Sequence, residues 1–194
     1  DAETGKPLIK DVNGDEQISD ADMTYIGKAI PDFTYGLNLH LAYKGFDLNV
    51  FGSGVGGNDI FTVLYRADTP MRNSLKYYYD NAWTPDNKSA SMPDPKAVAN
   101  DWYFWGSSAS MFSGAYFKIK QLQLGYTVPS NISQKVLISR LRCYVSLDDY
   151  FTITKYPGCD PETATVSTAP ERAGFDNGTY PQSKKLTFGL NITF

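Results

Sequence analysis

The segment with the clearest capacity for binding chemistry is the acidic stretch DVNGDEQISDAD, residues 11–22. It carries oxygen-bearing side chains at positions 1, 3 and 5 of a twelve-residue loop and another carboxylate at position 12, the spacing at which calcium takes its oxygen ligands. A backbone carbonyl at position 7 completes such a set. The ligands that this pattern predicts for Ca²⁺ are Asp11, Asn13, Asp15, Gln17 and Asp22.

Two residues depart from the calcium-loop pattern. Glu16 stands where the sharp turn prefers glycine, and Asp22 is shorter than the usual bidentate glutamate. The alternative interpretation is a surface loop that is rich in Asx turns and holds no metal. With either interpretation we expect a structural role, because no catalytic constellation stands beside the loop.

Other residues that could do chemistry are few. His40 is the single histidine and falls on the polar phase of an alternating segment, so we expect a polar-face residue rather than a general base. Cys143 and Cys159 lie neither in a CxxC motif nor beside a histidine, and two cysteines are too few for a disulfide framework. Without a nucleophile or an acid/base pair, the sequence predicts no enzyme activity.

Aromatic residues gather in the segment 55–112. Their rings could stack on a sugar or pack against a partner protein, and the alternative is simple packing within the segment. The candidate contact residues are Trp83, Trp102, Trp105 and Tyr78.

The elements that would position these residues show the period of β-strands. From Phe33 to Tyr43, apolar residues alternate with polar ones without a break, which predicts a strand with one apolar face. The dipeptide Lys44-Gly45 indicates a tight turn, and the alternation resumes beyond it. Residues 33–54 are therefore expected to form a β-hairpin.

A second hairpin is predicted for residues 113–150. The apolar phase slips at Lys120, which indicates a β-bulge, and residues 129–139 form the connection. A fifth strand is predicted at 184–194, where the alternation runs to the last residue. Long loops are expected in the remaining segments, which are 1–32, 55–112 and 151–183.

The composition of the two strand faces separates two classes of all-β protein. Across the five segments the apolar face carries no Asp, Glu, Lys or Arg, and the opposite face is mostly Thr, Asn, Gln, Gly and Ser. Aromatic residues gather near the strand ends, as they do at membrane interfaces. These features favour an antiparallel transmembrane β-barrel over a soluble β-sandwich, although a sandwich also has one buried and one wet face.

Charge and strand number add two expectations. The net charge of −3, without any Lys/Arg cluster, argues against a nucleic-acid partner. Five strands cannot close a bacterial outer-membrane barrel, so we expect the chain to be part of a larger polypeptide. Because short turns of such barrels face the periplasm, the long loops are predicted to be extracellular and the end at Phe194 periplasmic.

Five blocks of the chain carry a family resemblance, in order: DVNGDEQISDADMTYIGKAIPDFTYGLNLHLAYKGFDLNVFGSG, YYYDNAWTPDN, YFKIKQLQLGYTVPS, RLRCYVSLDDYFTITKYPGCDPE and YPQSKKLTFGLNITF. The sequence resembles the carboxy-terminal part of SusC/RagA-type TonB-dependent outer-membrane transporters, the nutrient importers of Bacteroidetes. The resemblance covers essentially the whole chain. Two departures are Asp149, where the family often has Asn, and Glu16 in the acidic loop.

The resemblance implies a fold and a set of partners. The family's barrel has twenty-two strands, of which this chain would supply the last five. A plug domain fills such a barrel, TonB supplies energy through the missing N-terminal part, and a SusD-like lipoprotein closes over the external loops on a captured glycan or peptide. The barrel-assembly machinery would read the terminal strand, at the residues Leu190, Ile192 and Phe194.

One alternative function remains open from the sequence. The same alternation and acidic loop would suit a soluble, secreted β-sandwich that binds carbohydrate and holds structural calcium. The two interpretations differ in whether the apolar strand face meets lipid or a second sheet. The sequence does not identify the transported substrate.

Overall fold

The computed structural model describes residues 1–63, 75–164 and 169–194. These residues form two compact units. The sheet unit comprises residues 31–57, 115–154 and 181–194, and the loop unit comprises residues 1–30, 58–114 and 155–180. Residues 64–74 of the predicted loop 55–112 lie outside the described residues. The same holds for residues 165–168 of the predicted loop 151–183.

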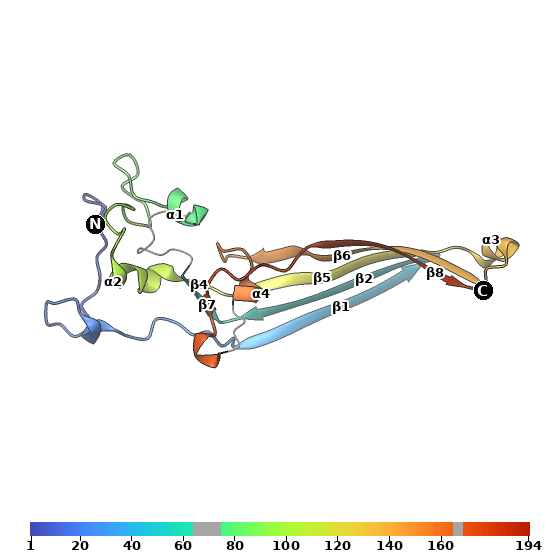
Figure 1. Cartoon of the computed structure of the whole chain (residues 1–194), viewed down its shortest axis with the longest axis horizontal. Helices are drawn as coiled ribbons and strands as arrows, with labels where there is room; N and C mark the ends of the chain where they lie inside the picture. Colours follow the sequence, from blue (N-terminus) through green and yellow to red (C-terminus); the bar gives the residue numbers. More distant parts are fainter. Residues whose placement is uncertain (64–74, 165–168) are drawn as a thin grey trace. The chain divides into compact units, whose positions relative to one another are not determined.

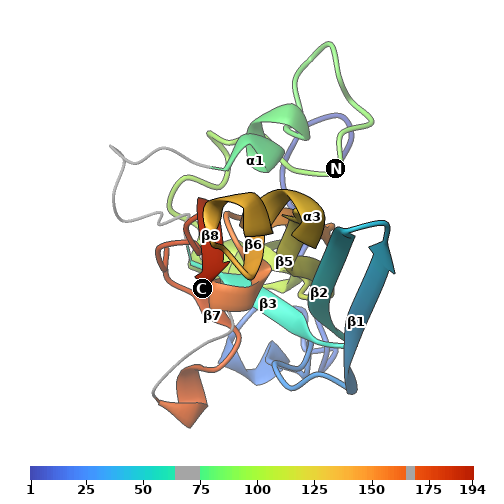
Figure 2. The same ribbon diagram turned by 90° about the vertical axis from the view of Figure 1, so that its right-hand side faces the viewer.

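The sheet unit is built from five antiparallel strands in the order β1-β2-β5-β6-β8 (Figure 1). Seen end-on, the strands follow one another in the same order (Figure 2). This confirms the predicted class of fold, five antiparallel strands. The strands are β1 (Phe33–Tyr43), β2 (Phe46–Gly56), β5 (Tyr116–Thr127), β6 (Arg140–Thr154) and β8 (Lys185–Thr193).

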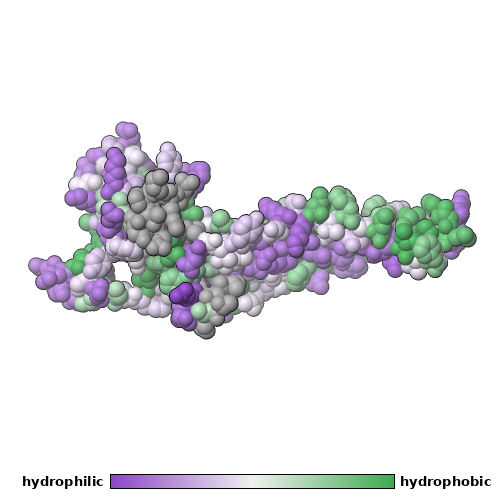
Figure 3. Space-filling model, viewed as in Figure 1, coloured by the Kyte–Doolittle hydropathy of each residue, from purple (hydrophilic) through white to green (hydrophobic). Residues whose placement is uncertain are grey.

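The register aligns the apolar residues of all five strands on one face. One cross-strand row runs through Leu39, Val50, Leu122, Leu147 and Leu186. In hydrogen-bonded strands, directly opposite residues share a face, so the alternation along each strand becomes a continuous apolar surface. Hydrophobic residues gather over the end of the sheet that carries α3 (Ser130–Ser133) (Figure 3).

Two local features set this register. Lys44 and Gly45 both have positive φ, 49° and 87°, as a two-residue hairpin turn of the primed type requires. The pairing of β5 with both neighbours shifts between Ile119 and Gln121, which confirms the bulge predicted at Lys120. On β6 the bulge is completed by Asp149, whose φ is 57° and whose carboxylate lies 3.5 Å from the Lys120 ammonium.

Two strands extend further than the alternation indicated. β2 continues to Gly56 and β6 to Thr154, beyond the expected ends at 54 and 150. The connection 129–139 contains α3 and the short 3₁₀ helix η3 (Gln134–Val136).

The loop unit contains regular structure in segments that the sequence predicts to be long loops. A small sheet has the order β4-β3-β7, in which β3 pairs antiparallel with β4 and parallel with β7. Ile60, Tyr156 and Ala164 form its buried core, with Phe112 packed against them. Strands of two to four residues are too short to show a period in the sequence. Their bounds are β3 (Asp59–Thr62), β4 (Met111–Ser113) and β7 (Phe175–Asp176).

The helices of the loop unit are short. In the described parts of the chain, none has the length and apolar character needed to cross a membrane. They are η1 (Asp20–Asp22), α1 (Lys76–Asp80), α2 (Trp102–Trp105), η2 (Ser108–Ser110), α4 (Pro161–Ala164) and η4 (Pro170–Arg172).

Candidate functional site

Two aspartates close the acidic loop 11–22 by accepting backbone hydrogen bonds. The carboxylate of Asp11 accepts from the N–H of Gly14 at 2.6 Å and of Glu16 at 2.8 Å. The carboxylate of Asp22 accepts from Val12 and Ser19, both at 2.8 Å, and so joins the two ends of the loop. These backbone donors, with Ser19 the strongest, lower the pKa of Asp22 below its ordinary value, because they stabilise the carboxylate form.

The middle of the loop is tied by its other predicted ligands. Asn13 Oδ1 accepts from the N–H of Asp15 at 2.9 Å, and the Asp15 carboxylate accepts from the Asn13 amide at 3.0 Å and from the N–H of Gln17 at 2.8 Å. Glu16 has φ 63°, so the sharp turn forms without the preferred glycine. A left-handed non-glycine residue costs about 1–2 kcal/mol.

The side chains of the acidic loop have the chemical type that a hard cation prefers, because carboxylate and amide oxygens bind calcium. The same oxygens can accept hydrogen bonds from the loop backbone while they do so. Among the described residues, however, no group of three or more His, Cys, Asp or Glu is assembled in metal-binding geometry. Calcium at Asp11, Asn13, Asp15, Gln17 and Asp22 therefore stays a prediction.

An aromatic groove lies in the loop unit, with a volume of about 1000 Å³. Trp83 and Trp102 both line it, together with Ser19 and Asp22 of the acidic loop. Two of the predicted contact residues and one predicted calcium ligand thus share a concave surface.

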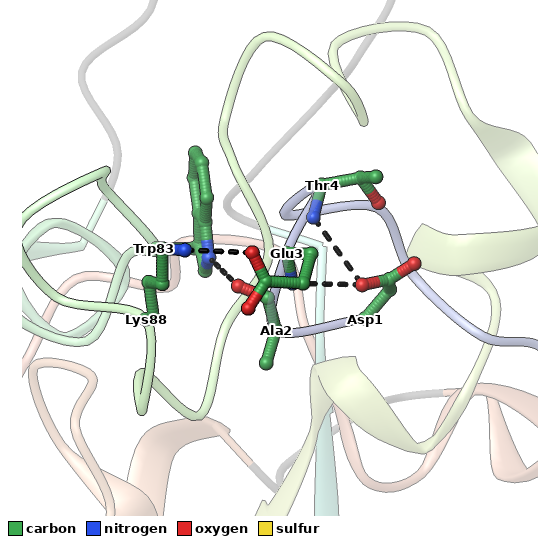
Figure 4. A network of polar contacts seen from close by, with 6 residues as sticks. All are labelled: Asp1, Ala2, Glu3, Thr4, Trp83 and Lys88. Carbon is green, nitrogen blue, oxygen red and sulfur yellow. Dashed lines mark hydrogen bonds and ion pairs between the residues drawn. The ribbon is translucent and has the colours of Figure 1, made fainter.

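Trp83 is held at this groove by the first residues of the chain (Figure 4). Its indole N–H donates to the carbonyl of Ala2 at 2.9 Å, and the neighbouring Lys88 pairs with Glu3 at 2.7 Å. Gly5, with φ 67°, lies under the ring, and a Cβ there would come within 2.6 Å of it. The indole therefore has a fixed position.

Helix α2 buries one aromatic residue and exposes two. Its first turn is capped by Asp101, which accepts from the N–H of Phe104 at 2.9 Å. Phe104 is buried, whereas Trp102 is 67% exposed and Tyr103 47% exposed, and both exposed rings line the groove. Tyr103 was missed in the sequence, because a four-residue helix has no readable amphipathic period.

The structure places Tyr78 and Trp105 away from the groove. Tyr78 is buried, its ring meets that of Trp105 edge-on at 5.3 Å, and the indole N–H of Trp105 donates to the carbonyl of Val98 at 2.7 Å. Burial raises the pKa of Tyr78 to about 12. These two rings take part in internal packing of the loop unit.

A buried polar pair supports the small sheet of the loop unit. Tyr156 donates its hydroxyl hydrogen to the carboxylate of Asp176, and both residues are buried. Burial, and then the contact with Asp176, raise the pKa of Tyr156 above its ordinary range. Nothing in the sequence indicates this pair, since the two residues lie 20 positions apart in one predicted loop and share no motif.

The predicted assembly residues lie at the end of β8. Leu190 pairs with Cys143 and Ile192 with Leu141 on the apolar face of the sheet, and Phe194 follows the last strand residue. All three are exposed, Phe194 by 86%. Their role as an assembly signal stays a prediction.

Comparison with known proteins gives several matches over the whole chain, although no protein-family model matches it. The chain is 36% identical over 199 residues to TonB-dependent receptor P3 of Formosa agariphila, covering 100% of this chain and 19% of that receptor. It is 25% identical over 200 residues to TonB-dependent receptor SusC of Bacteroides thetaiotaomicron, covering 99% of this chain and 18% of SusC. The chain thus spans about a fifth of the length of the curated relatives it matches.

Solved structures agree on the fold. The RagAB peptide importer in its open-open state superposes with a TM-score of 0.71 at 24% identity, covering 100% of this chain and 21% of that chain. The closed-closed state gives a TM-score of 0.70 at 24% identity, over 100% of this chain and 22% of that one. The RagAB importer therefore contains a region with the same fold as this chain, a five-stranded sheet with long loops.

Proposed function

We propose that this chain, which fits the carboxy-terminal segment of a SusC/RagA-type TonB-dependent transporter, forms part of the barrel of an outer-membrane nutrient importer. The whole protein would take up glycans or peptides. Its mechanism would be capture, closure and passage through the barrel, with no bond making or breaking by these residues.

The observation that carries the proposal is the division of the sheet into a charge-free face and a polar face. The row from Leu39 to Leu186 crosses all five strands without a polar residue. A charged side chain on a lipid-facing strand position costs about 2–4 kcal/mol at the bilayer midplane, so such a face suits hydrocarbon. The opposite face suits a water-filled interior.

The exposure of the apolar face favours this proposal over a soluble β-sandwich. In a sandwich the inner faces of two sheets interdigitate and bury their side chains. Here Phe188 is 76% exposed and Leu41 52% exposed, although both point to the apolar face. Lipid would cover these residues in the outer membrane.

The proposed partners follow from the comparisons and the sequence. The RagAB importer is known in an open-open and a closed-closed state, which supports a SusD-like lipoprotein lid over the loops of this protein as well. TonB would act on the part of the transporter outside these residues, and the barrel-assembly machinery would act on the β8 end. In this arrangement the loop unit is extracellular and Phe194 is periplasmic.

The aromatic groove is the proposed contact site for substrate or lid, through Trp83 and Trp102. Calcium, if bound by the acidic loop, would fix the wall that carries Ser19 and Asp22. The ion would then stabilise the shape of the groove and take no part in a reaction.

The test is uptake by cells that carry the full-length transporter. A strain without the transporter gene is compared with the wild type for accumulation of labelled oligosaccharides and labelled peptides, with and without a protonophore. Energy-dependent uptake of one class that is lost with the transporter gene supports the proposal. Equal uptake in all strains for both classes, or a protein that stays in aqueous solution without detergent, contradicts it.

A further inference from the structure

The connection 129–139 between β5 and β6 presents large apolar side chains to its surroundings. Ile132 is 56% exposed, Val136 is 64% exposed and Leu137 is 86% exposed. Ile132 and Val136 are four residues apart in the stretch formed by α3 and η3, so they share one side of it, and Leu137 follows directly as the residue that ends η3. An exposed apolar cluster of this kind marks a surface that meets something other than water.

Backbone hydrogen bonds hold this connection in one conformation. Ser133 is 2% exposed, its N–H donates to the carbonyl of Pro129 at 3.2 Å, and its carbonyl accepts from the N–H of Ile138 at 3.2 Å. The N–H of Ser139 donates to the carbonyl of Thr193 at 2.8 Å and attaches the connection to the end of β8. The apolar side chains are therefore exposed by a folded turn.

Leu137 adopts a backbone conformation that is unfavourable for leucine. Its φ is 61° and its ψ is 27°, in the left-handed region where glycine or asparagine commonly ends a helix. A bulky residue in this region is strained, and such strain is typical of positions with a functional constraint. Glycine would form the same turn without the strain, so the leucine side chain itself needs an explanation.

The exposed cluster adjoins the charge-free face of the sheet. That face reaches the connection through Tyr126 of β5 and through Leu141, which lies opposite Ile192 of β8. Figure 1 shows α3 and the C-terminus at the same end of the sheet, and hydrophobic residues gather over this end in Figure 3. The connection carries a single charged residue, the exposed Lys135. Apolar side chains beside a lysine are typical of a segment at a membrane interface.

We propose that the 129–139 connection inserts Ile132, Val136 and Leu137 into the periplasmic leaflet of the outer membrane and places Lys135 at anionic phospholipid headgroups. The inference rests on the proposed function, because it needs the apolar sheet face in lipid and the short connections on the periplasmic side. Insertion would remove the apolar side chains from water, and the lysine would be attracted to negative headgroups. A covering protein segment is an outcome that the test distinguishes.

The experiment measures spin-label accessibility in the full-length transporter, reconstituted in nanodiscs of phosphatidylethanolamine and phosphatidylglycerol. Single labels are introduced by Val136→Cys, Gln134→Cys and Leu190→Cys after replacement of the native cysteines, which include Cys143 and Cys159. Relaxation of each label by oxygen, which concentrates in lipid, is compared with relaxation by a water-soluble nickel chelate. Gln134 is exposed on the same connection and is the matched control. We expect the ratio of oxygen to nickel relaxation to be at least about threefold higher at Val136 than at Gln134.

The label at Leu190, on the apolar face of β8, separates this inference from the proposed function. Lipid-like relaxation at both Leu190 and Val136 supports the inference. Lipid-like relaxation at Leu190 with strong nickel relaxation at Val136 would place the connection in water and overturn the inference alone. Weak relaxation of Val136 by both reagents would show a covering protein segment, which would also overturn it. A Leu190 label in water would overturn the proposed barrel and the inference together.

A charge reversal tests the role of Lys135. Lys135→Glu is expected to raise nickel relaxation of the Val136 label about twofold in nanodiscs with phosphatidylglycerol and to leave it unchanged in nanodiscs of phosphatidylcholine alone. The control is Lys185→Glu, which makes the same charge reversal at the other end of β8 and should change neither value. An equal rise in both lipids, or an equal rise in both variants, would contradict the contact with anionic headgroups.

Discussion

Leu190 of β8 lies directly opposite Cys143 of β6 on the apolar face of the sheet, and the next residue, Asn191, lies opposite Arg142 on the polar face. Adjacent residues of one strand thus meet two different environments. This relationship is decided by the register alone, because a slip of one residue would exchange the two faces.

Leu190→Lys is therefore expected to impair barrel assembly, whereas Asn191→Lys should be tolerated. A lysine on the lipid face costs up to about 2–4 kcal/mol, and a lysine on the polar face meets water. The measurement is the yield of heat-resistant, outer-membrane transporter on gels of the two variants. Equal yields would show that the facing assignment is wrong.

Asp11→Ala with Asp15→Ala should lower the stability of the loop unit more in the presence of calcium than in chelator. These carboxylates hold the loop backbone in the structure, but a bound ion would depend on them more strongly. Thermal unfolding of the full-length protein is compared in calcium and in chelator. An identical loss in both conditions would leave the loop without a metal.

Trp102→Ala and Trp105→Ala should separate binding from packing. Trp102 is exposed at the groove, so its removal is expected to weaken ligand or lid binding with little change in unfolding temperature. Trp105 is partly buried and packs on Tyr78, so its truncation is expected to cost part of the about 3–5 kcal/mol that removal of a fully buried tryptophan costs. Binding and thermal unfolding are measured on both variants, and a large stability loss in Trp102→Ala would contradict the assignment.

Tyr156→Phe should destabilise the loop unit, because it leaves the buried Asp176 carboxylate without its tyrosine donor. Loss of one partner of a buried hydrogen bond costs about 1–3 kcal/mol. Hydrogen exchange of β3 and β7 reports the change. Asp176→Asn, which keeps an oxygen acceptor of the same shape, is the milder control.

The same pair predicts a pH dependence with a definite sign. The pKa of Tyr156 is raised in the folded protein, so its contribution is complete below the ordinary tyrosine value of about 10 and is lost as pH rises above it. The stability of the loop unit, measured by the protection of β3 and β7 against hydrogen exchange, should therefore fall more steeply above about pH 10 in the wild type than in Tyr156→Phe. Parallel pH profiles of the two proteins would show that Tyr156 is not the source of the pH dependence.

The sequence by itself determined the five strands, their bulge and their charge-free face. Each of these depends on a period of two along a continuous segment, from Phe33 onward, and such a period is local information. The spacing of the acidic loop was equally readable. Its backbone contacts to Asp11 and Asp22 follow within the same twelve residues.

Only the tertiary structure decided which aromatic rings are available for contact. Trp102 and Trp105 are three residues apart and alike in the sequence, yet one is exposed at a groove and the other packs on Tyr78. The pairing of β3 with β7 and the contact between Arg142 and Asp47 were also hidden. These contacts join residues about a hundred positions apart, and no local period specifies which distant side chains will meet.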